Sequence, residues 1–438
     1  MQTIDDTYQQ TLAYLYDKLP MFTRIGAAAY KADLSNTILL CEKLGNPHLQ
    51  LKCIHIAGTN GKGSTSHMLA SVMQTSGYKT GLYTSPHISD FRERIRINGE
   101  MISKEWLIDF VEKMKPSIEE IQPSFFEITV AMAFAYFAEQ KVDIAVIETG
   151  LGGLLDSTNI ITPEISVITN ISLDHTNLLG STLAEIATQK AGIIKHNIPV
   201  VVGEKQTETE SIFFTKAILQ QSQIYYADNL YEVIQRKQEG GLLHLKLVHK
   251  TAMRILNVQL DLLGEYQTKN IKTVLTVVDL LRTKSWHIKE QDVYQALRTT
   301  KKRTGIRGRF DVIEQEPKIV LDVAHNEAGL REVFAQVLQM KFAKLHIICG
   351  FVRDKEIGKV LPLFPKEANY YFTQANIPRA LPCKELLELG IEHQLKGQAF
   401  PVIQDAIQSA MNQAEKTDLI LITGSFFILD DAYSFLIK

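Results

Sequence analysis

The sequence predicts an α/β protein with a larger N-terminal domain and a smaller C-terminal domain. Short β-branched runs recur along the chain, each followed by a turn rich in Gly, Asn, Asp or Ser and then by a stretch with helical periodicity. This order is typical of parallel strands joined by crossover helices. The length of 438 residues also fits two to three domains.

The N-terminal domain, expected to span residues 1–300, contains five strand candidates. They are short and mostly apolar, as strands covered on both faces should be. They lie at residues 51–56, 79–84, 143–149, 165–171 and 198–202. These strands predict one mostly parallel sheet.

The pattern changes after this sheet. Residues 229–260 alternate between apolar and polar side chains, which favours a small antiparallel addition at the end of the first domain. Residues 266–281 predict a helix. The cationic, glycine-containing segment 299–309 is the best candidate for a linker.

The C-terminal domain, expected to span residues 301–438, repeats the strand and helix pattern. Strand candidates lie at residues 318–324, 344–349, 369–372 and 418–423, separated by intervals of helical length. Two such domains would leave a cleft between them.

Composition excludes several classes of protein. The 47 Lys and Arg against 49 Asp and Glu supply no field for nucleic acid or an acidic membrane. The longest apolar stretch, residues 130–138, is far below the ~20 residues that span a bilayer. The acidic N-terminus does not resemble a signal peptide, and the four scattered cysteines suggest neither zinc nor disulfides. We expect a cytoplasmic protein and a monomer, without nucleic-acid or membrane partners.

The segment GTNGKGS, residues 58–64, lies between a predicted strand and a predicted helix. Its glycines let backbone amides surround phosphate oxygens, and Lys62 can pair with the β and γ oxygens of ATP. The usual phosphate-loop pattern is not matched in full, because Ile56 occupies the first glycine position and Gly63 follows Lys62. A tight structural turn is the alternative. The expected ATP ligands of this loop are Gly58, Thr59, Asn60, Gly61, Lys62, Gly63 and Ser64.

This loop resembles the phosphate loop of the Mur ligase superfamily, and within it that of the folylpolyglutamate and dihydrofolate synthases. Further segments are similar to that family in order and spacing. They are TSPHISDFRERIRING from Thr84, SFFEITVAMAF from Ser124, IETGLGGLLDSTN from Ile147, NISLDHTNLLG from Asn170, QKAGIIK from Gln189, GRFDVI from Gly308, LDVAHN from Leu321 and ITGSFF from Ile422. The resemblance implies a P-loop ATPase-like N-terminal domain and a Rossmann-like C-terminal domain.

Two residues that follow predicted strands point to metal chemistry. Glu148 ends an apolar strand, and His175 follows the next one, so both should reach the carboxyl edge of the sheet. From the residues alone, Glu148 could be an ordinary charged strand end, and a structural role is favoured for a lone histidine. By resemblance, Ser85 and Glu148 match the ligands of one Mg²⁺ ion and His175 matches a ligand of a second.

Lys190 matches the lysine that the family carries as a carbamate. Thr182 and Glu185 form a plausible capping box for its helix. Without the resemblance, Lys190 would be a solvated helix residue. By resemblance, Lys62, Glu148, His175, Lys190 and His325 would carry the catalysis.

The resemblance also implies substrate sites. The loop after Glu148 and the start of the helix at Ser124 border the pterin pocket, although core packing explains the two phenylalanines equally well. The folate set comprises Ser124, Phe125, Phe126, Glu127, Leu155, Asp156 and Ser157. Asn270, Arg309 and Asp322 match contacts to ATP, and His325 and Ser425 match residues near the incoming glutamate.

We therefore expect an ATP-dependent ligase that adds L-glutamate to a folate through an acyl phosphate, with ATP as co-substrate and two Mg²⁺ ions. Glutamate addition to dihydropteroate and extension of tetrahydrofolate both remain open. A ligase for peptidoglycan precursors would need a domain ahead of the phosphate loop, where only 57 residues stand. A non-catalytic nucleotide-binding protein would have no need of Ser85, Glu148, His175 and Lys190, which are all present.

Overall fold

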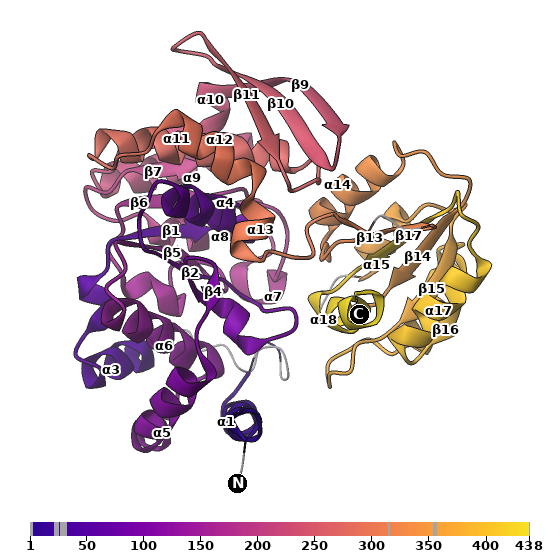
Figure 1. The fold of residues 1–438 in the computed structure, drawn as a ribbon, viewed down its shortest axis with the longest axis horizontal. Coiled ribbons are helices and arrows are strands. Elements are labelled where there is room, and N and C mark those ends of the chain that lie inside the picture. The colour runs from indigo at the N-terminus through magenta and orange to yellow at the C-terminus, as the bar shows by residue number, and fades with distance from the viewer. Residues whose placement is uncertain (1–2, 22–25, 27–32, 314–315, 354–356, 438) are drawn as a thin grey trace.

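The computed structural model describes residues 3–21, 26, 33–313, 316–353 and 357–437. An eight-stranded, a three-stranded and a six-stranded sheet organise these residues. Figure 1 shows the larger and the smaller α/β parts side by side, with the three-stranded sheet at one end of the larger part. The predicted fold class, a mostly parallel N-terminal sheet with a small antiparallel addition and a second α/β unit, is confirmed.

The eight-stranded sheet has the order β4-β3-β2-β5-β1-β6-β7-β8. The six neighbouring strands β2, β5, β1, β6, β7 and β8 pair in parallel, whereas β3 and β4 form an antiparallel edge beside β2. The strands are β1 Cys53–Ala57, β2 Thr80–Tyr83, β3 Ile95–Ile97, β4 Glu100–Met101, β5 Ile144–Glu148, β6 Ile165–Ile168, β7 Val200–Val202 and β8 Ile224–Tyr226. All five predicted strands are present, mostly shorter than expected, and β3, β4 and β8 are additions.

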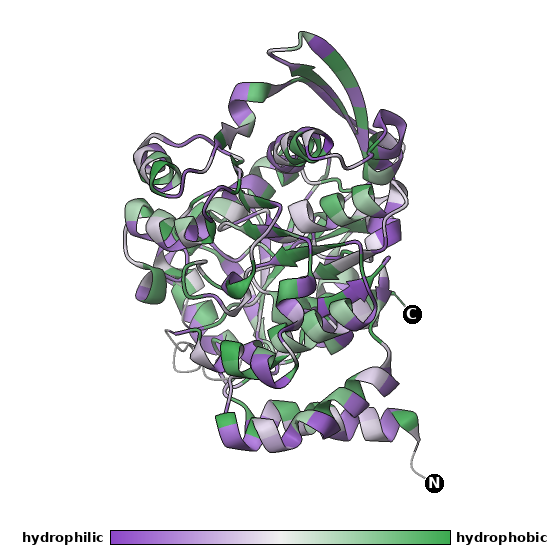
Figure 2. Cartoon of the chain, turned by 90° about the vertical axis from the view of Figure 1, so that its left-hand side faces the viewer, coloured by the Kyte–Doolittle hydropathy of each residue, from purple (hydrophilic) through white to green (hydrophobic). Residues whose placement is uncertain are grey.

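Helices cover both faces of this sheet, which explains why its strands are continuously apolar. Ile54 and Ile56 pack into one core cluster with residues of α4 and α11, while Ala145 and Ile147 pack into another with residues of α6. Figure 2 shows mainly hydrophobic strands at the centre and mixed colouring on the outer helices. The helices are α1 Ile4–Lys18, α3 Ser35–Lys43, α4 Lys62–Thr75, α5 Lys104–Ile121, α6 Phe125–Glu139, α7 Thr176–Leu179, α8 Leu183–Lys190, α9 Thr207–Leu219, α10 Ala227–Leu230, α11 Gln267–Thr283, α12 Glu290–Arg298 and α13 Thr300–Thr304.

The three-stranded sheet confirms the predicted antiparallel addition. It consists of β9 Tyr231–Glu239, β10 Leu242–His249 and β11 Arg254–Leu260. Its inner residues Leu243, Leu245 and Leu247 join the same core cluster as α4 and α11. Burial of alternate residues on one face accounts for the alternation in the sequence.

The segment 299–309 is only partly a linker. Its first half forms α13, in which Thr300 and Thr304 are buried and which packs against α4. The prediction is therefore wrong for this half, because small threonines here fit against a neighbouring helix. Gly305, with φ of +67°, ends the helix, and the chain then crosses to the second sheet.

The six-stranded sheet has the order β12-β13-β17-β14-β15-β16, with only β12 antiparallel to its neighbour. Its strands are β12 Asp311–Ile313, β13 Lys318–Leu321, β14 Leu345–Cys349, β15 Asn369–Thr373, β16 Lys396–Phe400 and β17 Leu419–Thr423. The helices α14 Glu327–Val337, α15 Ile357–Val360, α16 Cys383–Glu392, α17 Ile403–Gln413 and α18 Phe426–Leu436 complete this part. Over the described ranges, no helix has both the length and the apolar character needed to cross a bilayer.

Candidate active site

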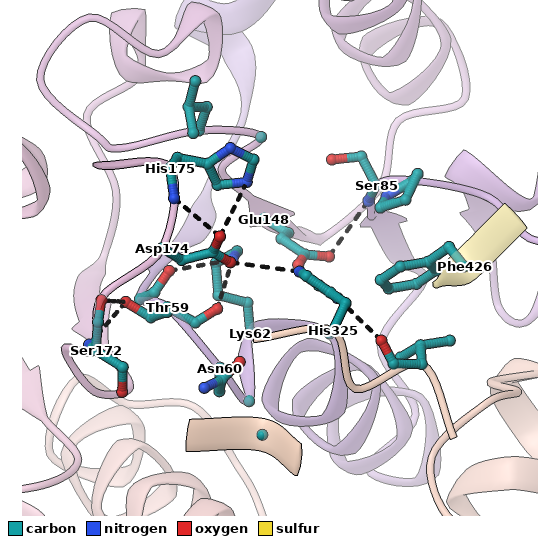
Figure 3. A pocket seen from close by; sticks show the side chains of 18 of the residues that line it. Thr59, Asn60, Lys62, Ser85, Glu148, Ser172, Asp174, His175, His325 and Phe426 are labelled. Atoms are coloured by element: carbon teal, nitrogen blue, oxygen red, sulfur yellow. Dashed lines mark hydrogen bonds and ion pairs between the residues drawn. The ribbon is translucent and has the colours of Figure 1, made fainter. Parts of the chain in front are cut away.

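A cavity of about 400 Å³ lies where the loops of the two large sheets face each other. Its walls come from the phosphate loop, from the loops after β2, β5 and β6, and from the loops after β13, β15 and β17. These are the carboxyl ends of parallel strands, where α/β proteins place their ligands. Figure 3 shows side chains from both parts of the chain converging here.

The phosphate loop joins β1 to α4 and has a fixed shape. At Gly58, with φ of +148°, a Cβ would lie 1.8 Å from the Thr169 hydroxyl. At Gly61, with φ of +84°, a Cβ would lie 2.3 Å from the Asn270 side-chain oxygen. Asn170 accepts the backbone N–H of Thr59 at 2.9 Å through its carbonyl. Only glycine fits at positions 58 and 61, and the loop is held ready for a ligand.

Lys62 is the first residue of α4 and folds back over the loop. Its Nζ donates to the carbonyl oxygens of Gly58 and Thr59, both at 3.1 Å. The Ser64 hydroxyl accepts a hydrogen bond from Gln267 at 3.1 Å, and Gln267 in turn accepts one from Asn270 at 2.8 Å. This places Asn270 beside the loop, although the two are far apart in the sequence.

Glu148 is the last residue of β5, and its side chain is buried with 4% exposure. Its Oε2 accepts the backbone N–H of Ser85 at 3.3 Å. Burial raises the pKa of Glu148 to about 7, partly offset by the charges of Lys62 and Arg309. A buried carboxylate with one weak hydrogen bond beside a serine is an oxygen donor set that suits Mg²⁺.

His175 and its neighbour Asp174 lie in the loop after β6. His175 is the N-cap residue of α7, with φ of +50°, and its side chain is 25% exposed. No group of three or more His, Cys, Asp or Glu side chains able to hold a metal is found within the described ranges. Metal ions at Glu148 and at His175 would therefore each need further oxygens, and Mg²⁺ commonly takes these from substrate phosphates.

Lys190 is buried with 4% exposure, so its interpretation as a solvated helix residue is wrong. Its Nζ donates to the Gly58 carbonyl at 2.8 Å, the same oxygen that Lys62 contacts. Burial and the nearby Lys62 charge lower the pKa of Lys190 to about 7. The lysine ends α8, whose capping box of Thr182 and Glu185 is confirmed.

The predicted folate residues line one wall of the cavity. Ser124 and Glu127 form a capping box at the start of α6, a structural role the sequence analysis did not assign. Phe125 is 3% exposed and packs against Phe91, whereas the Phe126 ring lies against the loop at Gly150, where a Cβ would be only 2.4 Å away. The loop residues Leu155, Asp156 and Ser157 complete this wall.

Asp156 holds the folate-side loop in shape. Its carboxylate accepts the backbone N–H groups of Leu151 at 2.7 Å and Thr158 at 3.0 Å. Burial raises the pKa of this carboxyl.

The second sheet contributes the opposite wall. Asp322 accepts hydrogen bonds from the Tyr266 hydroxyl at 2.7 Å and from the Phe310 backbone at 2.8 Å. The Arg309 guanidinium lies 5.2 Å from the Phe426 ring centroid. Its Nη2 is 3.0 Å from the point that a Cβ on Gly63 would occupy, so it faces the phosphate loop. Ser425 caps α18 by accepting the Phe427 backbone N–H at 3.2 Å.

Hydrogen bonds cross the cavity between its two walls. His325 Nε2 lies 3.3 Å from Asp174 Oδ2, while its Nδ1 lies 2.9 Å from the Val323 carbonyl. Asn326 donates to Asp174 at 3.0 Å and exchanges hydrogen bonds with Asn60 of the phosphate loop at 3.0 and 3.2 Å. Figure 3 shows Asp174 between His175 and His325. Asp174 and the Asn60–Asn326 pair thus join the two walls.

Every site residue named from the sequence lines this one cavity, although their individual roles stay predictions. Sequence reasoning missed Asp174, Tyr266 and Arg379. Asp174 directly precedes His175, so its place at the strand end was a usable signal. Tyr266 and Arg379 follow no motif that would have identified them.

Comparison with known proteins places both parts of the chain in one family. The description "Mur ligase middle domain" matches residues 56–278, and "Mur ligase, glutamate ligase domain" matches residues 308–426. A dihydrofolate synthase/folylpolyglutamate synthase of Bacillus subtilis is 32% identical over 97% of this chain and 98% of its own length.

Solved structures agree along the whole chain. Folylpolyglutamate synthase from Thermotoga maritima has a TM-score of 0.82 and 31% identity, covering 99% of this chain and 97% of that one. A bifunctional folylpolyglutamate synthase/dihydrofolate synthase with Mn, AMPPNP and L-glutamate bound has a TM-score of 0.81 and 26% identity, covering 98% and 97%.

Proposed function

The chain belongs to the Mur ligase family, in the group of folylpolyglutamate and dihydrofolate synthases, and on that premise we propose that it is an ATP-dependent ligase that adds L-glutamate to folates. The observation that carries the proposal is the cavity between the two large sheets. It brings together a phosphate loop, a buried carboxylate at a strand end and the second-sheet residues His325 and Ser425.

ATP would bind with its triphosphate on the backbone amides of the phosphate loop. Lys62 needs only to swing from the loop carbonyls toward the β and γ oxygens, and Arg309 faces the same loop. Asn270 and Asp322 would then contact the rest of the nucleotide. We propose that the chain divides into its two domains near residue 300, so that each domain supplies part of this site.

A divalent metal fits the residues at the β5 edge. We propose two Mg²⁺ ions, one held by Ser85 and Glu148 and the other by His175, with nucleotide phosphates supplying further oxygens. When bound, the metal would offset the charge of the triphosphate and of the acceptor carboxylate. The relative with Mn and AMPPNP bound supports a divalent ion beside the nucleotide.

The reaction follows from placing three substrates in this cavity. A carboxylate oxygen of the folate attacks the γ-phosphorus of ATP, and ADP leaves, giving an acyl phosphate. The amine of L-glutamate then attacks the acyl carbon, and inorganic phosphate leaves as the amine loses its proton. Lys62 would stabilise the charge on the transferring group, and the surrounding walls would exclude water from the acyl phosphate.

Lys190 would act as a carbamate in the working enzyme. Carbamate formation joins a neutral amine to carbon dioxide with loss of one amine proton to solvent, and the pKa of about 7 makes the neutral amine available near neutral pH. The product is an anion. Lys190 and Lys62, which now both donate to the Gly58 carbonyl, would then attract each other as a carbamate and an ammonium.

The acceptor pocket would take the pterin ring beside Phe126 and the loop at Leu155–Ser157. We propose both dihydropteroate and tetrahydrofolate as acceptors, which share the pterin and differ in the length of the tail. The four cysteines are buried thiols, which suits a reducing cytoplasm, and we propose that the enzyme acts there as a monomer.

The test is phosphate release from MgATP and L-glutamate with dihydropteroate or with tetrahydrofolate, with the products identified by mass spectrometry. Addition of one glutamate to both acceptors is the expected result. Addition to one acceptor alone would show that the enzyme has only the activity for that acceptor. ATP binding without glutamate addition to either would refute the proposal.

A further inference from the structure

The acceptor pocket makes a specific demand on its walls, if the proposed function holds. A flat heterocycle such as a pterin can turn in its own plane beside Phe126, and polar groups at fixed positions are what hold it in one orientation. Asp156 supplies the carboxylate of the loop Leu155–Ser157 and lines the cavity. How firmly this carboxylate is held therefore bears on how the acceptor binds.

Hydrogen bonds from its own loop hold the Asp156 carboxylate. Oδ2 accepts the Leu151 backbone N–H at 2.7 Å, and Oδ1 accepts the Thr158 backbone N–H at 3.0 Å. The Thr158 hydroxyl also donates to Oδ1, at 2.5 Å. The two backbone donors belong to the same loop as the carboxylate, so the hydroxyl is the contact that can tie it to another part of the fold.

His55 makes that tie from outside the loop. Its Nε2 lies 2.8 Å from the Thr158 hydroxyl oxygen, and both side chains are fully buried. Because the hydroxyl gives its one proton to Asp156, the His55 nitrogen must be the donor. Burial and the nearby charge of Lys195 lower the pKa of His55 to about 3, so the ring is neutral and its proton lies on Nε2. Its Nδ1, which has no hydrogen-bond partner within the described ranges, then carries no proton.

The position of His55 in the sheet makes it a rigid base for this chain of hydrogen bonds. His55 lies in the middle of β1, paired with Ile147 of β5 on one side and Ser166 of β6 on the other. The strand reads Cys-Ile-His-Ile-Ala, so His55 is its one polar side chain. A polar group at such a core position is costly to bury unless it is hydrogen-bonded, and Thr158 supplies that bond.

We propose that His55 and Thr158 are positioning residues for the folate acceptor, because the hydrogen-bond chain from His55 through Thr158 fixes the Asp156 carboxylate against the pterin ring. Asp156 lines the cavity, whereas His55 and Thr158 do not, so these two residues act through it. The charge of the carboxylate strengthens the bond from the hydroxyl, and the bond from His55 polarises that hydroxyl further.

The experiment compares wild type with Thr158→Val, which removes the hydroxyl and keeps the shape, and with Thr158→Ser, which keeps the hydroxyl. Initial rates are measured with dihydropteroate as acceptor at saturating L-glutamate. We expect the KM for dihydropteroate to rise about tenfold in Thr158→Val. The kcat and the KM for ATP should stay within about twofold, because the lost contact holds the acceptor equally in the ground state and the transition state. Thr158→Ser should recover most of the wild-type KM.

A second pair of variants tests the outer donor, and a third position supplies the control. His55→Leu removes the donor and should raise the KM for dihydropteroate about threefold, whereas the amide of His55→Gln can donate in its place and should recover part of the loss. The matched control is Thr276→Val. Thr276 is a buried threonine of α11 whose hydroxyl donates to the Lys272 carbonyl of its own helix at 2.9 Å, so this variant should keep the wild-type KM for both substrates.

The outcomes separate this inference from the proposed function. If wild type adds glutamate and Thr158→Val keeps its KM for dihydropteroate, the inference is overturned. A parallel rise in the KM for ATP, or a Thr158→Ser variant as impaired as Thr158→Val, would assign the chain a structural role and also overturn it. If Thr158→Val does not melt cooperatively, His55→Leu decides, and an unchanged KM there overturns the inference. A wild type that adds no glutamate would refute the proposed function, and calorimetry of dihydropteroate binding to wild type and Thr158→Val would then decide this inference by itself.

Discussion

Replacing Lys190 by Met should change how the stability of the protein depends on pH. The Lys190 amine is buried, and its pKa is lowered from 10.5 to about 7 by burial and by Lys62. In the unfolded chain the amine titrates near 10.5. Between these two values the unfolded state binds more protons than the folded state, so the stability of wild type rises with pH. Methionine has a similar length and does not titrate.

The size of the effect follows from the two pKa values. Well below pH 7 the amine is protonated in both states, and burial of the charged amine lowers the free energy of unfolding by about 5 kcal/mol. From pH 7 to 9 this cost should fall by about 2 kcal/mol, because the slope reaches its full value of about 1.4 kcal/mol per pH unit only above the folded-state pKa. Loss of the hydrogen bond to Gly58 affects the variant equally at every pH, and the carbonyl keeps Lys62 as a donor. The stability advantage of Lys190→Met over wild type should therefore shrink by about 2 kcal/mol over this interval.

Urea denaturation from pH 6 to 9 measures this difference. The buffers are free of carbon dioxide, metal and nucleotide, so that the lysine stays an amine. Trp106 and Trp286, the two tryptophans of the chain, both lie in the same part as Lys190, so their fluorescence reports its unfolding. Lys113→Met, at an exposed lysine of α5, is the control and should differ from wild type by a constant amount. A constant difference for Lys190→Met would refute the reasoning.

Three further experiments test other parts of the site. Burial raises the pKa of Glu148 to about 7, so its carboxylate becomes protonated as pH falls through 7. The Mg²⁺ concentration for half-maximal activity should therefore rise about tenfold for each pH unit below 7. A Mg²⁺ requirement that stays constant from pH 8 to 6 would contradict this. Gly58→Ala should weaken ATP binding more than about 100-fold by calorimetry, because its methyl would lie 1.8 Å from Thr169. The control Gly358→Ala, at a glycine of α15 without a positive φ and with no atom within 4 Å of the new methyl, should bind ATP as wild type does. Phe126→Ala should raise the KM for the folate about tenfold or more and leave the KM for ATP unchanged, and equal rises would show a general loss of structure.

The sequence predicts the central strands because burial on both faces requires continuous apolar runs. Strands such as β5 and β17 show this pattern in full. The edge strand β16, Lys396–Phe400, is mostly exposed and contains glycine, alanine and glutamine, so no such run marks it. Edge strands depend on pairing with a neighbour, which local sequence does not record.

The site was predictable where a residue ends a strand or starts a helix. Glu148 and the phosphate loop follow from their positions next to β5 and β1. The burial of Lys190 was not predictable from its own helix, because the Gly58 carbonyl that accepts its hydrogen bond belongs to a distant segment. The same holds for Asp174, whose partners His325 and Asn326 come from the second sheet.

The central claim is that this cavity transfers the γ-phosphoryl group of ATP to a folate carboxylate before glutamate attacks. A folate acceptor with heavy-isotope oxygen in its reacting carboxylate tests the claim most directly, with the released phosphate analysed by mass spectrometry. The account predicts one labelled oxygen in each phosphate formed together with glutamylated product. Unlabelled phosphate accompanying the same product would contradict the acyl-phosphate route.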